Sequence, residues 1–134
     1  MTDQQIFDTS ARGLILQGCK SEGNGQMFGH SFIDNQGRRC ALGFLLVKDN
    51  NSRFVDFYNV PPEIVDTTQV MGYLALPLEL MRIHNCCRVE DWPALLAACA
   101  KTFNLDDGVI SAALAEVAQR ALGQEVKLPE LVNV

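Results

Sequence analysis

Two helical patterns near the end of the chain, joined by a short link, constrain the fold most. Residues 92–103 and 109–121 both carry large apolar side chains at helical spacing, and Asp91 and Asp106 suit the positions just before them. Because the link is so short, the two helices are expected to form a helical hairpin. Trp92 is expected to be buried. The second helix is expected to bury its apolar stripe: Val109, Ile110, Ala113, Leu114, Val117 and Ala121.

Two further helices are predicted from their end signals. Thr2 and Gln5 have the spacing of a capping box ahead of an apolar stripe, which predicts a helix over about residues 3–17. Pro77 suits the first position of another helix, and Asn85 suits its end because asparagine tolerates the left-handed conformation. Together these signals make the chain mainly helical.

A β-hairpin is predicted in the first half of the chain. The stretch Asp34-Asn35-Gln36-Gly37 is typical of a turn, and residues suited to strands flank it. The apolar run 41–47 is too short for its periodicity to distinguish a buried strand from a buried helix. We interpret it as a strand that passes into a short helix. The predicted fold class is therefore α+β: a mainly helical small domain with one β-hairpin or small antiparallel sheet.

Length and charge narrow the class of protein. A chain of 134 residues can bury about two thirds of its unfolded surface, which predicts a single globular domain over residues 1–134. Its 11 basic and 16 acidic residues give a net charge of −5, so nucleic-acid binding lacks its usual electrostatic basis. The longest apolar run has about eight residues, too short to span a membrane. The first residues do not form a secretory signal, and the cytoplasm is the expected location.

The cysteines and glycines carry no strong motif. Five cysteines are an odd number for a disulfide framework, so reduced thiols are expected. His84 with the adjacent pair Cys86 and Cys87 lacks the two-to-four-residue spacing of structural zinc sites, and no metal is predicted. The glycines between residues 18 and 29 lack the spacing of phosphate-binding loops, and no cofactor is expected.

A thiol-dependent enzyme is the alternative reading of the same residues. Cys19, Cys40 or Cys86 could act as nucleophile, with His30 or His84 as the base. Sequence alone does not bring any such pair together in space.

A cluster of polar residues between apolar segments is a candidate ligand pocket. Its predicted residues are Arg39, His84, Asn85, Arg88 and Asp91. An alternative role for His84 and Asn85 is to cap the end of the helix that they terminate. A pocket here would take a small apolar ligand.

Several short stretches resemble a known group of proteins. They are Gly-Arg-Arg-Cys-Ala-Leu-Gly at residues 37–43, Ile-His-Asn at 83–85, Arg88, Glu-Asp-Trp at 90–92 and Leu-Leu at 95–96. Over about residues 37–103 the chain resembles integron cassette proteins, small bacterial proteins carried on mobile genes. The resemblance implies a soluble protein, often oligomeric, without an assigned activity.

The leading functional hypothesis is a non-enzymatic homodimeric binding or interaction module. Its partner would be a second copy, with a small apolar ligand or another protein also possible, and no membrane is involved. Small side chains lie on a second face of each of the last two helices: Ala94, Ala97 and Ala98 on the first, and Ala112, Ala115 and Ala118 on the second. A helix that is apolar on two faces must bury both, and a two-fold mate would cover the second one.

Overall fold

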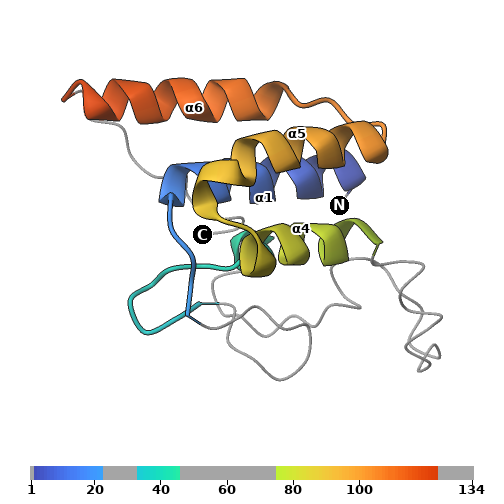
Figure 1. The fold of residues 1–134 in the computed structure, drawn as a ribbon, viewed down its shortest axis with the longest axis horizontal. Coiled ribbons are helices and arrows are strands. Elements are labelled where there is room, and N and C mark those ends of the chain that lie inside the picture. The colour runs from blue at the N-terminus through green and yellow to red at the C-terminus, as the bar shows by residue number, and fades with distance from the viewer. Residues whose placement is uncertain (1, 23–32, 46–74, 124–134) are drawn as a thin grey trace.

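The computed structural model describes residues 2–22, 33–45 and 75–123, and within these ranges the protein is all-helical (Figure 1). The four α-helices are α1 (Asp3–Gln17), α4 (Ala75–Cys86), α5 (Trp92–Thr102) and α6 (Gly108–Ala121). Two short 3-10 helices accompany them, η1 (Gly43–Leu45) and η2 (Val89–Asp91). Helix α1 lies in the centre and contacts η1, α4, α5 and α6. Figure 1 shows α6 along one edge of the molecule and α4 toward the other.

Helix α1 confirms the prediction made from its capping box. The Thr2 hydroxyl accepts a hydrogen bond from the Gln5 backbone N–H at 3.2 Å, and the Gln5 side chain accepts one from the Thr2 N–H at 2.8 Å. At the other end, Gly18 adopts the left-handed conformation (φ 68°), and its N–H bonds to the Leu14 carbonyl. Both ends are therefore satisfied by local sequence.

The core surrounds α1 on several sides. Its largest fully buried side chains are Trp92, Phe7, Ile6, Leu14, Leu16, Leu42, Leu45, Leu80, Ile83 and Leu96. The expected burial of Trp92 is confirmed, since its side chain is 1% exposed. The apolar segment around η1 lies directly on α1, where a Cβ at Gly13 would overlap the Phe44 ring. Glycine at this position allows the close approach of the two segments.

The α+β fold class is wrong for the described residues, which contain no β-strand. The predicted turn does form, and Asp34 and Arg38 are joined by a backbone hydrogen bond of 2.9 Å. Only one isolated antiparallel bridge follows, between Ile33 and Arg39. The chain then turns into η1, so the predicted strand at the start of the 41–47 run is also absent.

The side chain of Gln17 bonds to the backbone of Arg39 on the side that faces away from Ile33. Its amide oxygen accepts from the Arg39 N–H at 2.8 Å, and its amide nitrogen donates to the Arg39 carbonyl at 2.8 Å. A glutamine carries one acceptor and two donors, so it can satisfy both backbone groups of one residue. Gln17 thus takes the place that a neighbouring strand would occupy.

Helices α5 and α6 lie close to their predicted positions, but they form a loose hairpin. Helix α6 packs mainly on α1 rather than on α5. Of the stripe expected to be inward, only Ile110 and Ala113 are buried, while Leu114 is 42% exposed and Ala121 is exposed. Helix α6 is therefore covered on only one narrow face, mainly by α1. No helix in the described ranges is long and apolar enough to cross a membrane.

Candidate functional site

The five predicted pocket residues belong to three segments of the chain. His84 and Asn85 are in the last turn of α4. Arg88 directly precedes η2, and Asp91 is its last residue. Arg88 and Asp91 form a surface ion pair at 3.2 Å, with 72% and 49% of their side chains exposed. Arg39 lies beside α1, and its guanidinium donates to the Gly43 carbonyl at 2.7 Å. A common ligand for these five residues stays a prediction.

His84 is the most constrained polar side chain of this group. It is 1% exposed, and its ring stacks on Trp92 with the ring centres 5.6 Å apart. Its Nε2 accepts a hydrogen bond from the Ser21 backbone N–H at 3.2 Å, while Nδ1 lies 2.6 Å from Asn85 Oδ1. Because Nε2 accepts, the proton of the neutral ring is on Nδ1, which donates to Asn85.

This environment favours the neutral imidazole. Burial lowers the pKa of His84, and the positive charge of Lys20 lowers it further, against the opposing effect of the hydrogen bond to Asn85. The predicted capping role is wrong, because the His84 side chain reaches Ser21 across the fold and α4 continues to Cys86. Nothing in the sequence around Ser21 indicated this contact.

The thiols show little sign of activation. All five cysteines are free, and Cys40 and Cys99 are buried. Burial raises the pKa of both thiols, that of Cys99 to about 11, so both are protonated at neutral pH. The ring nitrogens of His84 bond to Ser21 and Asn85 rather than to a thiol. His30, the other predicted base, lies outside the described residues.

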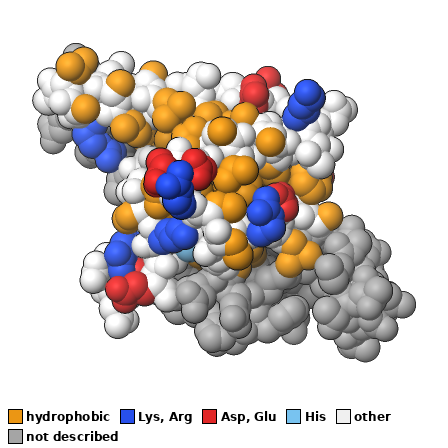
Figure 2. All heavy atoms as spheres, in the orientation of Figure 1, with side chains coloured by type: hydrophobic (Ala, Val, Ile, Leu, Met, Phe, Trp, Pro, Cys, Tyr) orange, Lys and Arg blue, Asp and Glu red, His pale blue; other side chains and the backbone are white. Residues whose placement is uncertain are grey.

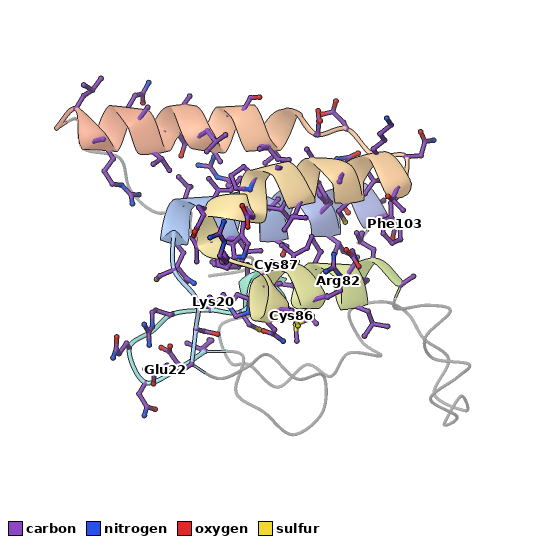
Figure 3. The ribbon with its side chains drawn as sticks, viewed as in Figure 1. Lys20, Glu22, Arg82, Cys86, Cys87 and Phe103 are labelled. Carbon is purple, nitrogen blue, oxygen red and sulfur yellow. The ribbon has the colours of Figure 1, made fainter. Side chains whose placement is uncertain are left out.

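The adjacent cysteines at the end of α4 differ in their surroundings. Cys86 is exposed, whereas the Cys87 sulfur lies 3.7 Å from the Arg82 guanidinium (Figure 3). Arg82 is itself paired with Glu79 one turn earlier. Within the part of the chain that the structure describes, no three His, Cys, Asp or Glu side chains gather closely enough to hold a metal ion.

A groove of about 300 Å³ separates α4 from α5. It is lined mostly by small and apolar side chains: Ala75, Glu79, Arg82, Leu95, Ala98, Cys99, Thr102 and Phe103. Figure 2 shows apolar side chains between pairs of opposite charges on this side of the molecule. Since Glu79 and Arg82 neutralise each other, the groove presents no free charge to a ligand.

Helix α6 has an unusual distribution of charge. Its two charged side chains bond to α1: Glu116 accepts two hydrogen bonds from Arg12, at 2.6 and 2.8 Å, and Arg120 donates to the Leu16 carbonyl at 3.3 Å. The side facing away from α1, here named the outer α6 face, is exposed and uncharged, and comprises Ser111, Ala112, Ala115, Ala118, Gln119 and Leu122. The middle of α6 shows only apolar and uncharged side chains in Figure 2.

The polar contacts at the two ends of α1 were not predicted. Gln4 bonds both to the N–H and to the carbonyl of Asp106, at 2.9 Å each, as Gln17 does with Arg39. Glutamines are common on helix surfaces, so only the fold distinguishes these two from solvent-facing ones.

The chain was compared with known protein families, with curated proteins and with solved structures. None of these comparisons finds a match. The resemblance to integron cassette proteins therefore stays a prediction.

Proposed function

We propose that this small helical protein is a non-enzymatic interaction module that forms a homodimer through the outer α6 face. The observation that carries the proposal is the direction of the charges on α6. A surface helix normally turns apolar side chains inward and charged ones toward water. Glu116 and Arg120 both bond to α1, although Arg120 is itself exposed, and exposed Leu122 and three alanines are left on the outside. This arrangement fits a helix that is covered on its second side.

A second copy of the chain is the partner that this face suits best. The whole chain has a net charge of −5, so two copies repel each other wherever acidic surfaces meet. The outer α6 face carries no charge and avoids that repulsion. Its small side chains let two α6 helices approach closely around a two-fold axis, where the same residues meet from both copies.

The size of the face sets the expected affinity. Fourteen residues make a helix about 21 Å long, so a single helix face is smaller than the roughly 800 Å² per partner of a standard interface. We therefore expect a dimer with a dissociation constant in the micromolar range.

The chemistry of the cysteines supports two further parts of the proposal: a reducing compartment and a function without thiol catalysis. Five free thiols fit a reducing compartment such as the cytoplasm. The raised pKa values of Cys40 and Cys99 disfavour thiol catalysis at these two residues, because the thiolate is the reactive form.

The test is size-exclusion chromatography with light scattering on two matched variants. Ala115→Glu places a carboxylate in the outer α6 face, and Ala94→Glu makes the same change at an exposed position of α5. Facing carboxylates repel across a two-fold interface, so Ala115→Glu should weaken the dimer at least about tenfold while Ala94→Glu leaves it unchanged. A monomeric wild type at micromolar concentration would overturn the proposal. Dissociation only by Ala94→Glu would place the interface on α5.

A further inference from the structure

The hydroxyl group of Ser21 is buried without a hydrogen-bond partner. Ser21 is 7% exposed, and its Oγ is shielded from solvent. A buried hydroxyl that makes no hydrogen bond destabilises the folded state, because it has lost its bonds to water without replacement. Such a group calls for a physical explanation.

The same residue contacts His84 through its backbone. Ser21 lies between Lys20 and Glu22 on the segment that leaves α1, and Figure 3 shows these two residues on the side of the molecule where α4 ends. The Ser21 N–H donates to His84 Nε2 at 3.2 Å. The unpartnered Oγ of Ser21 is only three covalent bonds from the Ser21 backbone nitrogen. Rotation about the Cα–Cβ bond therefore moves the hydroxyl relative to the His84 ring.

We propose that Ser21 and His84 form a two-position hydrogen-bond switch controlled by protonation of the ring. In the neutral state the Ser21 N–H donates to Nε2, and the Ser21 hydroxyl makes no hydrogen bond. When Nε2 takes up a proton from solvent, it becomes a donor and bonds to Ser21 Oγ. The Nδ1–H continues to donate to Asn85 in both states.

Protonation forces this exchange because it places two donors opposite each other. An N–H on Nε2 cannot bond to the Ser21 N–H, and both groups are shielded from water. The hydroxyl oxygen has free lone pairs and belongs to the same residue. The unpartnered Oγ of the neutral state is then the acceptor that the protonated state requires.

The groups around the ring place the transition below the ordinary pH range of an imidazole. From α5 the ring meets the neutral Trp92, and on α4 it meets the neutral Asn85. The segment after α1 contributes Ser21 and the positive charge of Lys20. Burial and Lys20 both oppose protonation, so the switch operates below the ordinary imidazole pKa of about 6.5.

Movement of Ser21 would also reach the 33–39 turn. The next residue, Glu22, donates its N–H to Asp34 at 3.0 Å and forms an ion pair with Arg38 at 3.2 Å. Any shift of the Ser21 backbone after its N–H loses Nε2 would therefore be transmitted to this turn through Glu22.

The fluorescence of Trp92 reports the protonation state of the His84 ring directly. Trp92 is the only tryptophan in the chain, and a protonated imidazole stacked on an indole quenches its emission. The full-length wild type is titrated toward acid beside Ser21→Ala and His84→Gln, with far-UV circular dichroism recorded at each pH. The wild type should lose emission below about pH 6.5 with its helices intact, and His84→Gln should show no such transition.

Ser21→Ala makes the decisive comparison, because it keeps the backbone N–H and removes only the hydroxyl. Loss of the acceptor for the charged ring should lower the fluorescence midpoint by about one pH unit. An unchanged or raised midpoint would overturn the switch. A wild type that shows no transition before its helices unfold, or a transition that persists in His84→Gln, would overturn it equally.

Discussion

Helices α1 and α6 are of similar length, yet they differ in burial in a way that composition does not predict. Helix α1 contains three charged residues among fifteen, and eight of its residues are buried. Helix α6 contains two among fourteen, and only two of its residues are buried. The helix with fewer charged residues is thus the more exposed one. Burial here depends on how many neighbours a helix has and on the size of its side chains.

The sizes of the side chains account for much of this difference. Helix α1 presents large side chains such as Phe7 and Leu14 to several neighbouring elements, whereas α6 presents mostly alanine and contacts mainly α1. Alanine favours a helix but contributes little apolar surface. The packing of α6 on α1 therefore leaves most of α6 uncovered, and the proposed dimer would cover it.

Substitution of a core side chain should have the largest effect. Trp92→Ala is expected to lower the free energy of unfolding by about 3–5 kcal/mol, because the buried indole fills the core and donates to the Ile83 carbonyl. At protein concentrations where the chain is monomeric, Leu122→Ala, at the end of α6 where the side chain is 80% exposed, should change it by less than about 0.5 kcal/mol. Chemical denaturation measures both values, and similar losses would erase the contrast between core and α6.

The two glutamine contacts of α1 should differ in strength. Gln17→Ala leaves both backbone groups of Arg39 without their partner, and we expect a loss of about 2 kcal/mol in unfolding free energy. Gln4→Ala removes similar bonds to Asp106 in an exposed setting, where water replaces them, and should cost about 0.5 kcal/mol. An equal cost in chemical denaturation would mean that burial does not distinguish the two ends of α1.

The ion pair between α1 and α6 should contribute modestly. A double-mutant cycle on Arg12 and Glu116 is expected to give a coupling of about 1 kcal/mol, since the pair is bidentate but about one quarter to one third exposed. The more exposed pair Glu79 and Arg82 within α4 should give about 0.3 kcal/mol. A coupling energy of Arg12 and Glu116 at or below that of the α4 pair would mean that this ion pair does not stabilise the packing of α6 on α1.

The smallest effect should be a local one in acid. Burial raises the pKa of Asp34, but hydrogen bonds from three backbone N–H groups and from the Arg38 guanidinium outweigh it and hold the pKa at about 2. The stabilisation from this carboxylate is complete above its usual pKa of 3.8 and is lost as the pH falls through about 2. An NMR titration of the Asp34 carboxyl carbon measures this value. A midpoint near 3.8 would show that these hydrogen bonds do not form. The resonances of α6 serve as the control, because they should not change in this titration.

The positions of the described helices could be read from the sequence because their signals are local. The capping box at Thr2 and Gln5 and the glycine at residue 18 each act within one turn, whereas Asp91 ahead of α5 makes no capping hydrogen bond and pairs with Arg88. The missing strand could not be foreseen, because the chain turns into η1 directly after Arg39 and a distant glutamine, Gln17, bonds to the outward backbone groups of Arg39 that a further strand would use. Non-local side-chain contacts leave no periodic pattern.

The candidate site was harder to predict for the same reason. Arg88 and Asp91 are three residues apart, and they pair with each other on the surface. The partner of His84 across the fold, Ser21, is 63 residues away in the sequence. Alanines on the second face of α6 were visible in the sequence, but the inward direction of Glu116 required the structure.

Sedimentation equilibrium of the wild-type protein in low and high salt tests the central claim most directly. If the outer α6 face is an uncharged two-fold interface, the protein should dimerise at micromolar concentration. Added salt should not weaken the dimer, since no ion pairs across the interface are screened. A monomer at all these concentrations would contradict the account, as would a dimer that dissociates when salt is added.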